Sequence, residues 1–364
     1  MKIIDRYILL KYLTTFFFCI ILFTAIVIVI DISEKTDNFT KSHLSAYQIM
    51  TDYYFGFIPR IDAMLFPLFV FISVIFFTSK MAGRSEVIAI LSSGVSYRRF
   101  MLPFIAGGLI LSSMLWFGYR YVVPHANKKW GDFEKRYIDI DGAAALANSS
   151  YKQNIYFKLD QNSYIGIRGY DTISKTGNGF FMQEFKDNKL VYNLRASNFS
   201  WDTAAKQWKL LNVSERMLAE INERVFNYPQ KMMNYNFKPI DLRKDNYLKD
   251  QMTTPDLQQF IKKEKVRGSN ELSELEVERY NRDAIPVSVI ILTIIGAVLA
   301  SRKVRGGSGA HIALGVVLSM VYILFSRFSV VFATKGSFPP VLASWLPNIT
   351  FGILAIILYR RAAR

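Results

Sequence analysis

The sequence predicts a polytopic α-helical membrane protein with an antiparallel β domain inserted between its third and fourth membrane spans. Two observations lead to this prediction. Six apolar segments are each about 20 residues long, the length that crosses a bilayer as a helix. Between the third and fourth segments lies a long polar region in which apolar and polar residues alternate. A soluble protein of 364 residues has no need for six such segments.

The apolar segments form two groups of three. They cover residues 9–30, 56–78, 100–123, 284–300, 310–333 and 341–359. The first segment is not expected to be a cleaved signal peptide. Its apolar core is too long, and Asp31, Glu34 and Lys35 follow it in place of a small-residue cleavage site.

Positive charges mark one side of the membrane. The chain has 45 Lys and Arg against 29 Asp and Glu, which gives a net charge of +16. Many of these cations flank the apolar segments at ends that would share one side: Lys2, Arg6, Lys11, Lys80, Arg84, Arg98, Arg99, Arg302, Lys303, Arg305, Arg360, Arg361 and Arg364. The loops at 31–52 and 334–340 hold fewer. The positive-inside rule therefore places both termini in the cytoplasm and the inserted domain on the opposite side. The same distribution argues against nucleic-acid binding.

The alternating region is expected to form a β domain over residues 137–252. Ile155, Phe157 and Leu159, for example, alternate with polar or amphipathic residues, and turn-rich breaks at 160–163 and 202–206 separate such runs. Short alternating strands joined by turns are typical of an antiparallel sandwich or jelly roll. The pattern favours a closed core over an inner face that stays open and could hold acyl chains.

Two helices are expected between the β domain and the fourth span. Thr253 or Thr254 can cap the first helix, and Glu278 and Arg282 are spaced to pair on the second, which leads directly into the span. The expected organisation is residues 1–136 for spans one to three, 137–252 for the β domain, 253–283 for the connecting helices and 284–364 for spans four to six.

The sequence contains no motif for catalysis. The glycine-rich run at 306–309 lacks the lysine of a phosphate-binding loop, and there is no zinc-protease or nucleophile-elbow motif. Cys19 is the only cysteine, so no disulfide can form within the chain. His43, His125 and His311 lie on three different segments. We therefore expect a chain that is not an enzyme and binds no metal or cofactor itself.

The loop between the second and third apolar segments is the most informative one. Over residues 81–96, Ser85 is a candidate N-cap, Glu86 complements the helix dipole in the first turn, and Gly94 is a plausible stop. An apolar stripe at helical spacing is formed by Ile88, Leu91 and Val95. This pattern fits either an interfacial helix lying on lipid or a coupling helix that docks on a cytoplasmic ATPase.

The same loop, R-S-E-V-I-A-I-L-S-S-G-V-S, resembles the S-E-x-x-x-M-x-x-x-G-x-S stretch of the LptF/LptG permeases, the membrane subunits of the lipopolysaccharide-export ABC transporter. Four further stretches resemble the family in the same order, at 5–8 (D-R-Y-I), 278–286 (E-R-Y-N-R-D-A-I-P), 305–307 and 338–348. The D-R-Y-I start is more like the G-type subunit. The similarity covers the whole chain.

The resemblance implies six spans with a periplasmic β-jelly roll between the third and fourth. It also implies a multi-pass protein of the inner membrane that pairs with a second LptF/LptG-type permease on an LptB-like ATPase dimer, which binds the ATP. Such a complex extracts lipopolysaccharide and passes it to an LptC/LptA-like periplasmic bridge. The family's ATPase-coupling positions fall on Arg84, Ser85, Glu86, Ala89, Ile90, Ser93 and Gly94. One departure is Ile90, where the family often has Met.

Charged residues inside the spans suggest a lipid site. Arg60, Arg120 and Arg327 fall within apolar segments, towards the side of the inserted domain. Charge in hydrocarbon is costly, so such residues usually face a cavity or a partner, and arginine makes forked contacts to phosphate. Lys35, at the end of the first span, is a fourth candidate, although Asp31 and Glu34 precede it where some G-type subunits carry a basic residue. The alternatives are snorkelling and pairing, such as Arg60 with Asp62.

Two other functions remain open at this point. A membrane-anchored assembly or sensor protein would use the β domain to bind a periplasmic partner without transport. An integral-membrane lipid-modifying enzyme would need His, Asp or Glu clustered at one membrane face, and the sequence has no such cluster.

Overall fold

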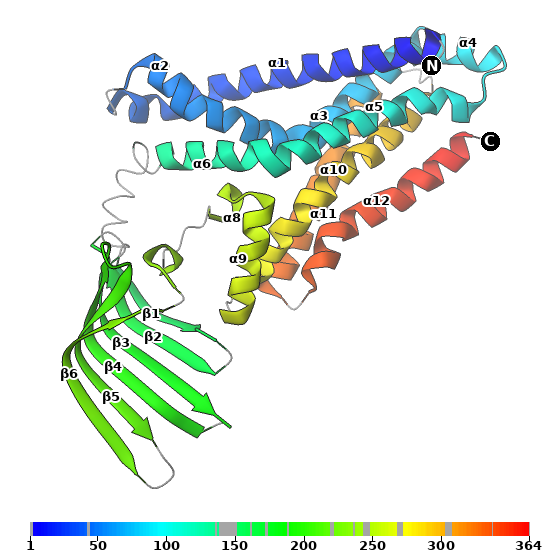
Figure 1. The fold of residues 1–364 in the computed structure, drawn as a ribbon. Helices are drawn as coiled ribbons and strands as arrows, with labels where there is room; N and C mark the ends of the chain where they lie inside the picture. Colours follow the sequence, from blue (N-terminus) through cyan, green and yellow to red (C-terminus); the bar gives the residue numbers. More distant parts are fainter. Residues whose placement is uncertain are drawn as a thin grey trace. The chain divides into compact units, whose positions relative to one another are not determined.

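The computed structural model divides into two compact units, which are described separately (Figure 1). The membrane unit comprises residues 1–134, 249–257 and 273–364, and the β unit comprises residues 135–248 and 258–272. The structure describes residues 3–41, 44–134, 137, 151–160, 162–171, 174–187, 189–218, 222–235, 237–242, 248–267, 272–302, 308–336 and 338–363. The 305–307 motif and the cations Lys2, Lys303, Arg305 and Arg364 lie outside these residues.

Six helical stretches are long and apolar enough to cross a membrane, which confirms the predicted spans. Their main helices are α1 (Ile3–Lys41), α3 (Phe55–Gly83), α5 (Tyr97–Phe117), α10 (Leu272–Ala300), α11 (Ser308–Lys335) and α12 (Pro340–Ala362). Several extend beyond the apolar segments. The helix α1 continues through Lys35 to Lys41, and α10 begins in the charged region before the fourth span. The helix α10 therefore joins the connecting region to the span without a break.

Two spans contain π-helical segments. The segment η1 (Ile49–Tyr54) lies between α2 (Ala46–Gln48) and α3, and η2 (Gly118–Val122) lies between α5 and α6 (Val123–Phe133). Such wide turns are frequent at functional sites because they re-aim side chains. Here η1 carries Tyr53 and Tyr54, and η2 carries Tyr119 and Arg120.

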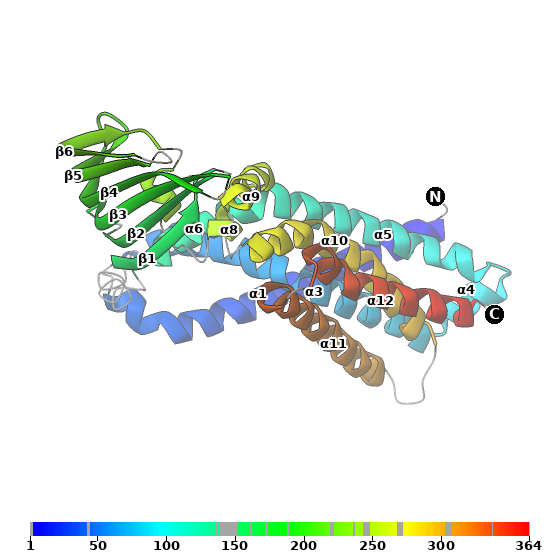
Figure 2. The same cartoon turned by 90° about the horizontal axis from the view of Figure 1, so that it is seen from below.

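Aromatic packing and a few polar bonds hold the membrane unit together. The side chains of Tyr12 and Phe16 on α1 are fully buried. Gly107 on α5 lies so close to Tyr12 that a Cβ atom there would sit 2.5 Å from the ring. The hydroxyls of Tyr12 and Thr293 lie 3.0 Å apart in the interior. Asn348 on α12 donates to the Ala284 carbonyl at 2.6 Å, which fastens α12 to α10 (Figure 2).

The helices α1 and α11 are the least covered of the spans. Within their most apolar windows, only 11% of the α1 residues and 22% of the α11 residues are buried. Large apolar side chains remain exposed on both helices, including Phe18, Ile21, Val29, Val317, Leu324 and Phe332. In a bilayer these faces contact lipid or another protein.

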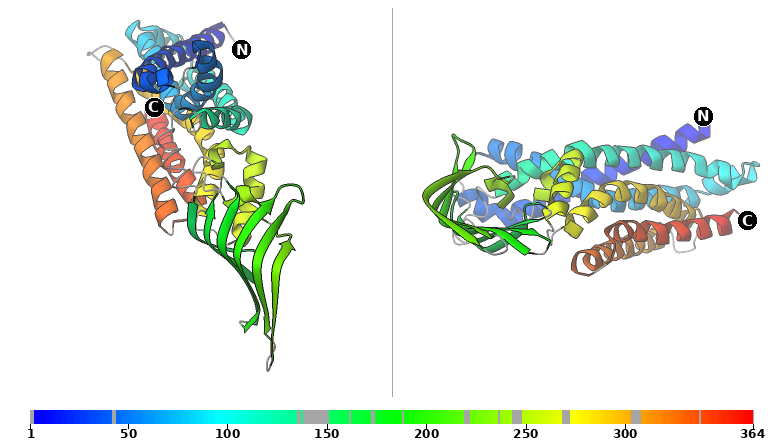
Figure 3. Two further views of the ribbon diagram at one scale, coloured as in Figure 1. Left: turned by 90° about the vertical axis from the view of Figure 1, so that its left-hand side faces the viewer. Right: turned by 60° about the horizontal axis from the view of Figure 1, so that its bottom comes forward.

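The β unit contains one antiparallel sheet whose strands follow in sequence order, β1-β2-β3-β4-β5-β6. Its strands are β1 (Tyr151–Lys158), β2 (Ser163–Asp171), β3 (Thr176–Lys186), β4 (Lys189–Asp202), β5 (Gln207–Leu218) and β6 (Glu223–Met233). The predicted antiparallel β domain between the third and fourth spans is confirmed. Figure 3 shows that the sheet is strongly curved.

One face of this sheet forms a hydrophobic core. Ile167, Phe180 and Trp208 are almost fully buried there, together with Phe237 from the segment that returns after β6. The Trp208 indole donates to the Phe237 carbonyl at 3.0 Å, which ties that segment to the sheet. The closed two-sheet core favoured by the alternation is not formed by the described strands, because the second layer consists of this segment, with η4 (Pro239–Leu242).

Candidate functional site

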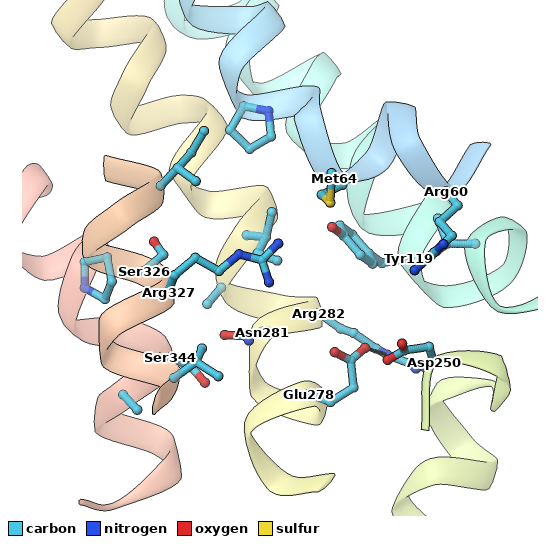
Figure 4. A pocket seen from close by; sticks show the side chains of 18 of the residues that line it. Arg60, Met64, Tyr119, Asp250, Glu278, Asn281, Arg282, Ser326, Arg327 and Ser344 are labelled. Atoms are coloured by element: carbon cyan, nitrogen blue, oxygen red, sulfur yellow. Dashed lines mark hydrogen bonds and ion pairs between the residues drawn. The ribbon is translucent and has the colours of Figure 1, made fainter. Parts of the chain in front are cut away.

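A pocket of about 290 Å³ lies inside the membrane unit. The helices α3, α6, α10, α11 and α12, the segment η2 and the residues around Asp250 form its walls. Its polar lining consists of Arg60, Tyr119, Asn127, Asp250, Glu278, Asn281, Arg282, Ser326, Arg327 and Ser344 (Figure 4). A polar interior between apolar helices favours a ligand that carries charge.

Arg327 extends from α11 into this pocket, with its guanidinium directed towards the space between α3 and α10 (Figure 4). Among the residues that the structure describes, it makes no hydrogen bond or ion pair. A guanidinium on a membrane helix is costly to leave without a partner. Its five N–H donors are therefore available to an anion that enters the pocket.

Arg60 lines the same pocket from α3. Its guanidinium carbon lies 3.7 Å from the centre of the Trp130 ring, a cation–π contact. The considered pairing with Asp62 is not formed, since Asp62 instead accepts a hydrogen bond from Thr24 at 2.6 Å. Stacking leaves the N–H edges of Arg60 free to bind an anion in the plane of the guanidinium.

The structure does not bring Arg120 and Lys35 to this pocket. Arg120 stacks on Trp116 at 5.1 Å and is not among the lining residues, although its neighbour Tyr119 is. Lys35 instead bonds to Glu134 and to the Tyr53 hydroxyl at 3.1 and 2.6 Å.

The contacts around Lys35 account for the acidic residue Asp31, which lies one helical turn before it. Asp31 is buried and accepts hydrogen bonds from Tyr53 at 2.9 Å and Tyr54 at 3.0 Å. Lys35 lies 3.8 Å from the same carboxylate. The π-helical turn of η1 thus supplies two adjacent tyrosines to one carboxylate on α1. Lys35 therefore has its partners within the chain, and these contacts are structural.

Arg282 is a pocket residue whose importance the sequence did not indicate. It is 3% exposed and bonds to Glu278 at 2.9 Å, as the i,i+4 spacing predicted. It also donates to the backbone carbonyls of Lys249 at 2.9 Å and Met252 at 2.8 Å. These carbonyls end the short helix α8 (Leu248–Gln251), so Arg282 fixes this segment against α10. No local pattern marks carbonyl partners some 30 residues away.

Two carboxylates balance part of the positive charge in the pocket. Glu278 is paired with Arg282. Burial raises the pKa of the Asp250 carboxyl, although the charges of Lys249, Arg60 and Arg282 oppose this effect. With Glu278 engaged, Arg60 and Arg327 are the cations best placed to hold an incoming anion.

The expected coupling helix is shorter than residues 81–96. The helix α4 comprises Glu86–Ser92, while residues 81–83 belong to α3. Ser85 occupies the N-cap position of α4 as predicted, but it does so in a left-handed conformation with φ of 62° and makes no capping bond from its side chain. Gly94, with φ of 86°, ends the turn after the helix as predicted.

One face of α4 points into the core of the membrane unit. Val87 is 1% exposed, and Ile90 and Leu91 pack against the same core. Ile88, a member of the apolar stripe expected from the sequence, is 53% exposed. The expected coupling residue Ile90 therefore contacts this chain's own core.

Besides Ile88, the outer face of α4 and the turn after it carry small side chains, Ala89, Ser92, Ser93 and Gly94. At its start, Glu86 accepts a hydrogen bond from the Tyr7 hydroxyl at 3.2 Å and lies 3.9 Å from Arg84. The coupling positions that remain accessible are thus Arg84, Ala89, Ser93 and Gly94, with Glu86 partly exposed.

Six membrane-spanning helices, an inserted β domain and an interior pocket lined by arginines define a multi-pass membrane protein. The family model described as "Lipopolysaccharide export system permease LptF/LptG" matches residues 6–361, nearly the whole chain. The chain therefore belongs to the LptF/LptG permease family of lipopolysaccharide export, and the family and the six helices point to a multi-pass protein of the inner membrane. The match does not distinguish the F type from the G type. No curated protein matches the chain.

Proposed function

We propose that this chain is the permease subunit that extracts lipopolysaccharide from the inner membrane and passes it to a periplasmic bridge. Hydrolysis of ATP in a partner ATPase drives the transfer. The main supporting observation is the guanidinium of Arg327, which enters an interior pocket without a partner among the described residues, next to Arg60.

The chemistry of the pocket suits a phosphate group of the glycolipid. A phosphate oxygen pair accepts two parallel N–H bonds from one guanidinium, and the partly desolvated site strengthens that interaction. A volume of about 290 Å³ admits a head-group fragment but not acyl chains. The chains then lie against the exposed apolar faces of the spans.

The helix α4 is the proposed contact with an LptB-like ATPase dimer. Its buried Val87 and partly buried Leu91 hold it to the ends of α3 and α5, while its outer face is accessible and, apart from Ile88, small. A partner that moves α4 therefore moves two spans that line the interior. This arrangement converts a docking motion into a change of pocket shape.

Two further features support the proposed partners. The exposed apolar faces of α1 and α11 suit a second LptF/LptG-type permease, with the glycolipid between the two chains. The outermost strand β6 pairs only with β5 over the described residues, and its free edge suits strand addition by an LptC/LptA-like bridge.

Replacement of Arg327 tests the proposal. In the complex purified in mild detergent and returned to a bilayer, Arg327→Gln should reduce crosslinking of lipopolysaccharide to the pocket and its stimulation of ATP hydrolysis, each by about tenfold, as expected for one lost charge-assisted contact. Arg120→Gln is the matched control, because Arg120 lies one residue from the pocket lining and stacks on Trp116.

The outcomes separate the alternatives. Unchanged crosslinking and ATPase stimulation in Arg327→Gln would refute a role for this arginine in lipid binding. Failure of any nucleotide-binding subunit to co-purify would refute transport and favour a membrane-anchored assembly protein.

A further inference from the structure

A second crevice, of about 280 Å³, lies between α1 and α3 beside α4, separate from the Arg327 pocket. The N-terminal end of α1 and the short helix α4 lie at the same end of the membrane unit (Figure 1). The proposed function assigns no role to this crevice.

Three cations line the crevice: Lys11 on α1, Lys80 near the end of α3, and Arg84 in the turn that follows. Lys11 and Lys80 make no hydrogen bond or ion pair through their side chains with any described residue. The contact of Arg84 with Glu86 is long, at 3.9 Å, and Glu86 also accepts a bond from Tyr7. The crevice therefore has an excess of positive charge with unused donors.

Apart from Tyr7, Thr14, Thr15 and Glu86, the remaining walls of the crevice are apolar. Phe18 on α1 and Phe76 on α3 line the crevice and are 63% and 41% exposed. A free anion would gain nothing from these rings, whereas an anion with an attached hydrocarbon chain would cover them. Basic crevices between membrane helices at the positively charged end of a protein bind anionic lipid head groups.

We propose that an anionic phospholipid of the membrane binds in this crevice. Its phosphate lies between Lys11, Lys80 and Arg84, and one acyl chain covers Phe18 and Phe76. The site holds a lipid of the surrounding bilayer and is distinct from the pocket of Arg60 and Arg327. Binding at this site does not depend on the proposed transport function.

Occupancy has a consequence for α4 that does rest on the proposed function. A phosphate beside Arg84 competes with Glu86 for the guanidinium, and the existing contact is long enough to be exchanged readily. Glu86 is then held by Tyr7 alone and is more available to a docking partner. Anionic lipid would in this way favour ATPase docking.

Native mass spectrometry of the full-length protein, purified in mild detergent, tests the binding. Phosphatidylglycerol and phosphatidylcholine with the same acyl chains are the probes. We expect retention of phosphatidylglycerol, and a loss of at least about tenfold in Lys11→Gln/Lys80→Gln, because each cation near a membrane surface contributes roughly 1 kcal/mol. Arg360→Gln/Arg361→Gln is the control, since it removes the same charge from the exposed last turn of α12.

Further arms distinguish the remaining explanations. Lys11→Arg/Lys80→Arg should restore binding, which shows that the Gln variant has not simply misfolded. An equal loss of phosphatidylglycerol binding in Arg360→Gln/Arg361→Gln would show that surface charge in general attracts the lipid. Binding by Lys11→Gln/Lys80→Gln equal to that of the unaltered protein would show that the two lysines snorkel to the membrane surface without forming a site. Displacement by soluble glycerophosphoglycerol at the same concentration as the lipid would identify a free-phosphate site. Each of these three results overturns the proposal.

Discussion

At the scale of single residues, the interior of this protein depends on a few charged side chains with well-defined partners. Arg282 illustrates this, because its guanidinium holds a carboxylate and two backbone carbonyls from a distant segment. Arg279, on the same helix, pairs with Asp283 at the same spacing and is 19% exposed at its side chain against 3% for Arg282. The two arginines therefore form a natural comparison.

Removal of Arg282 should destabilise the membrane unit. In Arg282→Ala, the partly buried Glu278 keeps its charge without its partner and the carbonyls of Lys249 and Met252 lose their buried donor, for a cost of about 3–5 kcal/mol. Arg279→Ala should cost at most about 1 kcal/mol, since its pair is closer to the surface. Thermal unfolding in detergent measures both, and similar melting temperatures for the two variants would contradict the prediction.

A buried carboxylate in the β unit makes a prediction about pH. Burial opposes ionisation of Glu215, but hydrogen bonds from Lys231 at 2.5 Å and from Tyr192 outweigh it and lower its pKa below the ordinary value. A lowered folded-state pKa contributes stability that is present above the unfolded pKa of about 4.3 and is lost as the pH falls through the folded value.

Glu215→Gln should therefore speed hydrogen exchange of the β5 amides at pH 7. The expected increase corresponds to a loss of about 1–3 kcal/mol in the free energy of opening the sheet. The difference from the unaltered protein should shrink as the pH falls below 4. Glu223→Gln is the control, because the Glu223 side chain is 45% exposed and its pair with Arg216 lies at the surface. A difference that stays constant down to low pH would exclude the ionic origin.

At the scale of elements, α4 is the segment where sequence and structure differ most. The spans could be predicted because length and apolarity decide membrane crossing whatever the neighbours are. Which face of a seven-residue helix points inward depends on the spans packed against it, and the φ of 62° at Ser85 just before it is a conformation that no residue type there demands. Likewise, the Arg282 contacts depend on carbonyls that only the folded chain brings near.

The accessible face of α4 gives a prediction for this element. Ala89→Trp adds a large side chain to an exposed position, so it should leave thermal unfolding unchanged and prevent co-purification of the ATPase. Arg98→Trp, at an exposed position in the first turn of α5, should leave both thermal unfolding and co-purification of the ATPase unchanged. Retention of the ATPase by Ala89→Trp would move the docking surface away from α4.

At the scale of the whole molecule, the order of spans and sheet could be predicted from hydropathy and alternation, but the layering of the β domain could not. Alternation specifies that one face of each strand is buried. It does not specify what covers that face, and here the cover is the segment containing Tyr235 and Phe237 instead of a second sheet among the described strands.

The positive-inside distribution predicts the orientation of the whole chain. In a Cys19→Ser background, a cysteine placed at Ser197, exposed on β4, should react with an impermeant maleimide in intact spheroplasts. A cysteine at Ser93, after α4, should react only after lysis. The opposite pattern would invert the topology and refute both the docking and the transfer proposals.

The uninterrupted course of α10 has a mechanical consequence. Its 29 residues form a rod of roughly 44 Å at about 1.5 Å per residue. If such a rod pivots by some five degrees about one end, the other end sweeps about 4 Å, close to the spacing between neighbouring β-strands. Arg282 anchors residues 249–252 to this rod, so this segment of the membrane unit moves with it. Arg282 lies about 27 Å from Ala300 at about 1.5 Å per residue, so a small tilt deep in the bilayer shifts the pocket wall at Asp250 by about 2 Å.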